Sequence, residues 1–118
     1  RALALLAEGK VSDATSLLRA VAESRLARIA QDRREAATAF RNLGVIAGLG
    51  DPKAALDAYR QAAALDPDDL DSALWAAWLE KERGERAAAR TRFDALLARD
   101  TLPGRTRLWS LIGRGDIL

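Results

Sequence analysis

Apolar residues return every three or four positions along almost the whole chain, which is the period of one face of an α-helix. Polar and charged residues fill the positions between them, so the pattern predicts a series of amphipathic helices. The apolar positions form six stripes: Ala14, Leu17, Leu18, Val21, Ala22 and Leu26; Phe40, Leu43, Ile46 and Ala47; Ala55, Leu56, Tyr59, Ala62 and Ala63; Ala73, Leu74, Ala77 and Trp78; Ala89, Phe93, Leu96 and Leu97; and Leu108, Leu111, Ile112 and Gly115.

Glycine and proline mark the ends of these helices. The residues at or beside the breaks are Gly9, Gly50, Gly84, Pro52, Pro67 and Pro103. A glycine commonly ends a helix, and a proline cannot continue one that is already formed. The region 10–43 has neither residue, but Asp32 followed three positions later by Glu35 resembles a capping box, so we place a break near Asp32. The predicted helices are 1–8, 11–30, 33–49, 52–65, 70–83, 86–99 and 105–118.

Composition points to an all-α chain. Alanine supplies 26 residues and leucine 19, so two good helix formers occupy 45 of 118 positions. Residues that favour strands are scarce, with 3 Val, 4 Ile and 5 Thr. We therefore predict helices throughout and no sandwich or barrel.

Candidate chemistry is nearly absent. The chain has no cysteine and no histidine, which excludes disulfides, zinc fingers, thiolate nucleophiles and Ser-His-Asp triads. The run Gly48-Leu49-Gly50 lacks the third glycine and the Lys, Ser or Thr of a nucleotide-binding loop. The acidic stretch 66–71 lacks the central glycine and distal glutamate of a calcium loop. We expect a chain that is not an enzyme and that needs neither cofactor nor metal.

The charge is nearly balanced overall but unevenly distributed. Residues 1–50 carry +3, residues 51–82 carry −5 and residues 83–118 carry +4, for a total of +2. This total does not favour a nucleic-acid partner. No apolar run approaches the ~20 residues of a membrane span, and the start does not resemble a signal peptide, so we expect no membrane partner and a cytoplasmic location. Because Arg1 rather than Met begins the chain, we expect a segment of a longer protein.

A repeated pattern links two parts of the chain. Both have a helix, a turn with Gly and an acidic residue, a second helix with Ala and an aromatic residue four positions later, and then Asp. The residues that carry it are Leu43-Gly44, Gly50-Asp51, Ala55, Tyr59, Ala62 and Leu65-Asp66-Pro67 in the first unit, and Gly84-Glu85, Ala89, Phe93 and Asp100 in the second. This pattern resembles the tetratricopeptide repeat family, although Ala76-Ala77 stand where Leu-Gly is expected. The end of the chain, 109–118, is similar to bacterial arrays of the kinesin light chain type.

The resemblance implies a right-handed superhelical solenoid of antiparallel helix pairs forming a single domain over 1–118. It divides the chain into a partial repeat with a long second helix (1–32), two repeats (33–69 and 70–104) and a truncated first helix of a further repeat (105–118). Stacking is also expected on physical grounds, because one helix pair cannot bury both of its apolar stripes alone. An ordinary helical bundle with the same stripes is the alternative.

In this family the first helices of the pairs line a concave groove. By that resemblance, the residues expected to line it are Arg41, Val45, Leu49, Leu74, Trp78, Lys81, Trp109, Ile112 and Asp116. Trp75 lies on roughly the same face as Trp78, and either tryptophan has two interpretations: it binds a partner, or it packs between repeats. Val45, Leu74 and Trp78 interrupt the basic positions that the family's carboxylate clamp requires, which argues against binding of acidic C-terminal tails.

We therefore expect a protein-interaction scaffold that binds a peptide or a helix in this groove. Two alternatives remain open. One is self-association, with a homo-oligomer formed through the apolar C-terminal helix 108–118. The other is an accessory domain of a larger enzyme or regulator.

Overall fold

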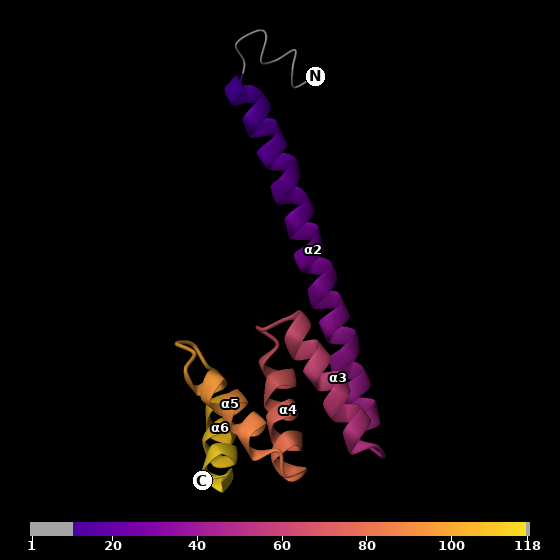
Figure 1. Ribbon diagram of the computed structural model, residues 1–118, viewed down its shortest axis with the longest axis vertical. Coiled ribbons are helices and arrows are strands. Elements are labelled where there is room, and N and C mark those ends of the chain that lie inside the picture. Colours follow the sequence, from indigo (N-terminus) through magenta and orange to yellow (C-terminus); the bar gives the residue numbers. More distant parts are fainter. Residues whose placement is uncertain (1–10, 118) are drawn as a thin grey trace. The chain divides into compact units, whose positions relative to one another are not determined.

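The computed structural model describes residues 11–117, and every regular element in this part of the chain is an α-helix (Figure 1). The prediction of an all-α chain is therefore confirmed. The helices are α2 (Val11–Ala47), α3 (Pro52–Leu65), α4 (Leu70–Glu82), α5 (Arg86–Leu97) and α6 (Gly104–Ile117). The predicted helix 1–8 lies outside the described residues.

The chain divides into two compact units, Arg1–Arg33 and Arg34–Leu118. Helix α2 contributes residues to both of them, and the other four helices belong to the second unit. The candidate functional site lies entirely within the second unit.

The predicted helix break at Asp32 is wrong, because α2 runs without interruption from Val11 to Ala47. An acidic cap residue favours a helix start only where the chain also leaves the helical conformation. The polar residues around Asp32 include arginine, glutamine and glutamate, which are good helix formers, and no glycine or proline forces a break there. The boundary between the two compact units nevertheless falls one residue after Asp32, between Arg33 and Arg34.

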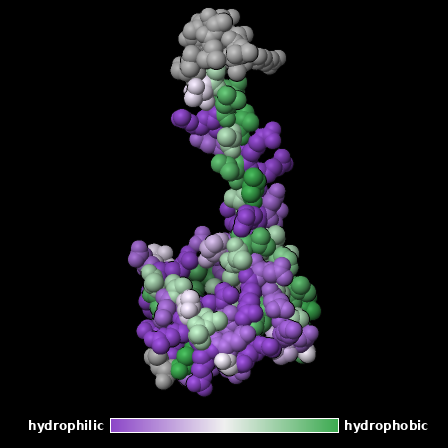
Figure 2. Space-filling view, in the orientation of Figure 1, coloured by the Kyte–Doolittle hydropathy of each residue, from purple (hydrophilic) through white to green (hydrophobic). Residues whose placement is uncertain are grey.

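In the first unit the predicted apolar stripe is largely exposed. Leu17 and Leu18 are each 62 % exposed and Leu26 is 64 % exposed, whereas Ala14 is buried. Apolar and hydrophilic side chains lie together on the surface of this part of α2 (Figure 2). The reason is that the described residues of this unit form a single helix, so no second described helix of the unit covers the stripe.

In the second unit, aspartate residues cap the starts of two helices. The Asp51 carboxylate accepts a hydrogen bond from the Ala54 amide at 3.1 Å, and proline follows Asp51 at the first helical position of α3. At the start of α4, the buried Asp69 carboxylate accepts bonds from the backbone amide and the hydroxyl of Ser72. Gly84 follows the end of α4 with φ of 81°, a conformation that glycine adopts without strain. These caps explain why the predicted bounds of α3 are correct and those of α4 differ by one residue.

Helix α4 is the centre of the second unit, because it contacts α3, α5 and α6. Figure 1 shows α3, α4 and α5 following one another across this unit. One buried cluster joins α3 to α4, and a second joins α4 to α5. The first comprises Ala55, Leu56, Tyr59 and Ala76, and the second comprises Ala77, Ala89 and Phe93. Each helix thus buries one face on the helix before it and another on the helix after it, as stacked repeats do.

Two glycines let aromatic rings approach a helix backbone closely. A Cβ atom added at Gly44 would lie 2.8 Å from the ring of Tyr59, and one added at Gly113 would lie 2.3 Å from the ring of Phe93. Both distances are shorter than a carbon–carbon contact allows. The two glycines therefore fix how closely α2 approaches α3 and α6 approaches α5.

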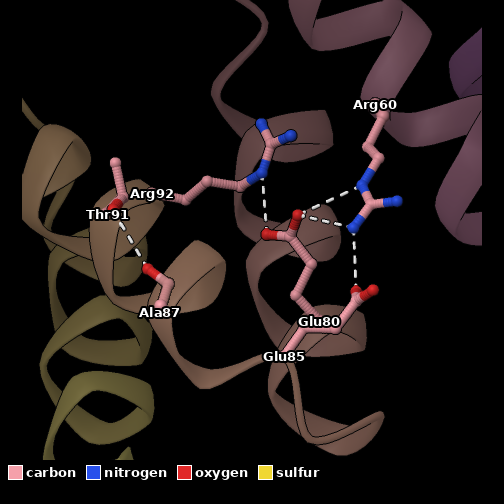
Figure 3. Close-up of polar contacts among 6 residues, drawn as sticks. All are labelled: Arg60, Glu80, Glu85, Ala87, Thr91 and Arg92. Atoms are coloured by element: carbon pink, nitrogen blue, oxygen red, sulfur yellow. Dashed lines mark hydrogen bonds and ion pairs between the residues drawn. The ribbon is translucent and has the colours of Figure 1, made fainter.

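A buried carboxylate ties three helices together. Glu80 on α4 is 2 % exposed and accepts hydrogen bonds from Arg60 on α3 and from Arg92 on α5, at 2.8–3.1 Å (Figure 3). Arg60 also donates to Glu85 at 2.8 Å. Burial lowers the pKa of Arg60, but its hydrogen bonds and charge interactions with Glu80 and Glu85 outweigh that effect and raise it. A carboxylate in this position is stabilised by two cations rather than by solvent.

Helix α6 packs through a different face from the one its apolar pattern predicted. Leu108, Leu111 and Ile112 are 55 %, 52 % and 41 % exposed, whereas the buried residues of α6 are Thr106, Ser110 and Gly113. The large ring of Phe93 occupies the space between α5 and α6, so only small side chains fit opposite it. The apolar stripe of α6 consequently remains on the surface of the described chain.

Candidate functional site

A hollow of about 530 Å³ lies between α4 and α6. Its α4 residues recur every three or four positions, which places them on one face of that helix. We call it the tryptophan hollow because all three tryptophans of the chain line it. Its lining residues are Asp71, Leu74, Trp75, Trp78, Leu79, Glu82, Arg105, Thr106 and Trp109.

Aromatic contacts hold the three indoles in place. Trp78 meets Trp109 edge to face with ring centroids 5.9 Å apart, and its other aromatic neighbour is Phe93 at 6.1 Å. Trp75 stacks on Tyr59 at 6.2 Å, with 16° between the ring planes. Trp75 is nevertheless 54 % exposed and Trp109 44 % exposed. The hollow therefore presents two ordered, half-exposed indoles on a base formed by a third.

Charged groups lie at both ends of the hollow. At one end Lys81 places its ammonium 4.2 Å from the centroid of the Trp78 ring and donates to Glu82 and Asp116, at 3.1 Å and 3.3 Å. Burial lowers the pKa of Lys81, but these two carboxylates outweigh it and raise the pKa. At the other end Asp71 begins the α4 face and Arg105 begins the α6 face, and neither makes an ion pair with another residue in the described chain.

A second, smaller hollow of about 310 Å³ adjoins the first. Trp75 and Leu79 border both hollows. The other residues that line the second hollow are Val45, Gly48, Leu49, Pro52, Ala55 and Tyr59. Apolar surface thus continues from the C-terminal end of α2 past α4 to α6.

Five of the nine residues that the sequence predicted for the groove line one of these two hollows. Leu74, Trp78 and Trp109 line the tryptophan hollow, and Val45 and Leu49 line the smaller one.

The other four residues, which are Arg41, Lys81, Ile112 and Asp116, do not line either hollow. Arg41 pairs with the N-cap residue Asp69 at 3.1 Å and so supports the start of α4. Lys81 lies over the ring of Trp78 and forms ion pairs with Glu82 and Asp116. Ile112 is 41 % exposed on the surface of α6 outside both hollows.

Sequence reasoning left the role of Trp75 open between partner binding and packing and did not include it among the groove residues, although Trp75 borders both hollows. It also missed the three charged residues Asp71, Glu82 and Arg105. The signal was present in the spacing, because residues 71, 75, 79 and 82 share one face of α4. The position of Arg105 opposite that face depends on how α6 packs. The apolar pattern of α6 alone predicts the wrong packing face for this helix.

The described residues contain no group of three acidic side chains placed to hold a metal ion. Within the same residues, no helix is both long enough and apolar enough to cross a membrane. The surface offers aromatic rings, aliphatic side chains and a few charges. Such a surface recognises another molecule by shape, apolar contact and charge.

Helices that stack in succession, each with one face on its predecessor and one on its successor, define an α-helical repeat protein. The family model described as tetratricopeptide repeat matches residues 47–114, more than half of the chain. The chain belongs to this family. No curated protein and no solved structure matched it. Tetratricopeptide repeats generally mediate protein–protein interactions, and the family is typically non-catalytic.

Proposed function

We propose that this chain is a non-catalytic scaffold that binds a peptide or a helix of a partner protein in the tryptophan hollow. The observation that supports this proposal most strongly is the pair of half-exposed indoles, Trp75 and Trp109, on opposite walls of one hollow. Tryptophan is among the residues that contribute most to binding when they are buried at an interface. Its exposure in an unbound protein leaves apolar area that a partner can remove from water.

The hollow is also ordered before any partner arrives. Trp78 is held by Phe93 and Trp109, and Trp75 by Tyr59. Side chains fixed in this way lose little conformational freedom on binding, so more of the contact energy appears as affinity. The volume of about 530 Å³ lies within the range of about 300–1,000 Å³ that is usual for ligand pockets.

The same proposal includes the repeat arrangement. We propose repeats at 33–69 and 70–104 and the first helix of another at 105–118, stacked as a right-handed superhelix. The contact of α4 with α6, two helices further along the chain, supports this arrangement. It brings the first helices of successive pairs side by side and so forms the groove.

The proposal is tested by selecting peptides from a displayed random library on the immobilised protein and measuring their affinity by calorimetry. We expect Trp75→Ala to weaken the selected peptides by about tenfold or more. Leu108→Ala is the matched control, because Leu108 is 55 % exposed on α6 but lies outside both hollows. Selected peptides that bind Trp75→Ala as tightly as the unaltered protein would contradict the proposal.

A second candidate function is self-association through α6. The observation that favours it is the exposed apolar face formed by Leu108, Leu111 and Ile112. Association of two copies through this face would give a mass that falls on dilution in static light scattering. Leu111→Asp should then restore the monomer, whereas Trp75→Ala should leave the dimer intact.

A further inference from the structure

The tryptophan hollow has an unpaired carboxylate beside an open indole face. Asp71 and Trp75 are four positions apart on α4, so their side chains are neighbours on the helix surface. Asp71 is exposed and has no ion-pair partner among the described residues. Tyr59 covers one face of the Trp75 ring, and 54 % of Trp75 remains exposed. A carboxylate and a ring face in this relation attract a cation together.

Beside the hollow, a cation of the chain itself is already held in this way. Lys81 lies 4.2 Å from the centroid of Trp78 and bonds to Glu82 and Asp116. The indole supplies the negative face of its ring, and the carboxylates supply the counter-charge. Asp71 and Trp75 offer the same two elements at the opposite end of the hollow, where no cation of the described chain is paired with them.

Charged groups of both signs lie in and beside the hollow. Asp71 and Glu82 are negative, and Arg105 on α6 is positive. The pair of Lys81 with Asp116 adds one charge of each sign at the Glu82 end. The net charge around the hollow is therefore −1, and the acidic segment 51–82 includes both α3 and α4. Arg105 opposes a cation at the Asp71 end, so its removal should strengthen the binding of one.

We propose that the partner segment is basic and apolar, and that it places an arginine or lysine side chain over Trp75 beside Asp71. An adjacent apolar side chain of the same segment packs against the exposed part of Trp109 in the same hollow. This inference rests on the proposed function, because it assigns the chemistry of the segment that occupies the hollow. It predicts the opposite charge preference from a site for acidic tails.

The test uses the peptides selected on the unaltered protein. Arginine in each selected peptide is replaced by citrulline, which keeps the shape of the side chain and removes its charge, and lysine is replaced by acetyl-lysine. Affinities are measured by calorimetry for the unaltered protein, Asp71→Asn and Arg105→Gln. Circular dichroism and the thermal midpoint check that each variant is folded.

We expect the uncharged peptides to bind the unaltered protein about tenfold more weakly. Asp71→Asn should weaken the basic peptides and leave the citrulline peptides unchanged. Arg105→Gln should strengthen the basic peptides. The inference is overturned if peptides that depend on Trp75 bind equally well with citrulline, or if they are acidic and depend on Arg105. If no peptide depends on Trp75, the proposed function itself fails and this inference fails with it.

Discussion

The rings of Trp78 and Trp109 meet edge to face with their centroids 5.9 Å apart, although they belong to α4 and α6 and the whole of α5 separates them in the sequence. This contact brings α4 and α6 side by side and forms the base of the tryptophan hollow. Trp78 also packs against Phe93 in the core. The same indole therefore belongs both to the fold and to the candidate site.

Trp75 and Trp78 should differ in how much they contribute to the stability of the fold. Trp78→Ala removes contacts with Phe93 and Trp109 and should lower the free energy of unfolding by about 2–4 kcal/mol. Trp75→Ala alters a ring that is 54 % exposed and should cost about 1 kcal/mol. Urea unfolding followed by circular dichroism measures both values. Equal losses for the two variants would contradict the account, and they would also make Trp75 a poor test of binding.

Gly113→Ala should destabilise the protein, because its Cβ would lie 2.3 Å from the Phe93 ring. Either the ring or α6 must move, at a cost of about 1–3 kcal/mol. Gly115→Ala is the matched control on the same helix, since nothing lies within 4 Å of the added Cβ. It should instead stabilise the helix by about 0.5–1 kcal/mol.

Combining Gly113→Ala with Phe93→Leu tests whether a clash with the Phe93 ring causes the loss of stability. If the clash with the ring is responsible, Gly113→Ala should cost less in a Phe93→Leu background than in the unaltered protein. Thermal unfolding of the four proteins gives this coupling directly. Additive effects would show that the glycine is needed for another reason.

Glu80→Gln should destabilise the chain by about 2–4 kcal/mol, because it removes a buried charge that two arginines face. Arg60 is 35 % exposed and Arg92 29 % exposed, so solvent compensates part of the loss. Glu82→Gln is the control, since Glu82 is 67 % exposed and should change stability by less than about 0.5 kcal/mol. An unaffected Glu80→Gln would show that the network in Figure 3 contributes nothing net.

Stability should fall at alkaline pH. Burial raises the pKa of Tyr59 above its ordinary value of 10.0, so folding favours the neutral phenol. The pKa of Lys81 is also raised, above 10.5, so folding favours its charged form. In both cases the folded state binds the proton more tightly, so the contribution is complete below about pH 10 and is lost as pH rises through the raised values.

Urea midpoints between pH 7 and pH 11.5 test this pH dependence. We expect them to be steady to about pH 10 and to decline above it, and Tyr59→Phe should make the decline shallower. A rise in stability above pH 10 would contradict the raised values.

The sequence predicts those features of the fold that depend on local chemistry. Asp51 and Pro52 define the start of α3, and Gly84 lies at the turn after α4. The continuity of α2 through Asp32 was not predictable in this way, because a capping pattern and a continuous helix use the same residues there. The pattern of α6 predicted the wrong face, since Phe93 from another helix decides which side chains fit. Long-range packing is not contained in the period of one helix.

The residues of the candidate site likewise fall into those that the sequence predicts and those that depend on long-range packing. Trp78 and Trp109 follow from the family resemblance, whereas Asp71 and Arg105 line the same hollow only because α4 and α6 lie side by side. Glu80 belongs to none of the apolar stripes, so the sequence pattern does not place it in the core. Its burial depends on arginines contributed by two other helices.

The central claim is that a partner segment occupies the tryptophan hollow. Because all three tryptophans of the chain line it, 5-fluorotryptophan incorporated into the protein reports on this site in ¹⁹F NMR spectra. The three signals are assigned by single Trp→Phe variants, and a library-selected peptide is then added. The account predicts that the signals of Trp75 and Trp109 shift in proportion to the bound fraction measured by calorimetry. A peptide that binds while both of these signals stay unchanged would contradict it.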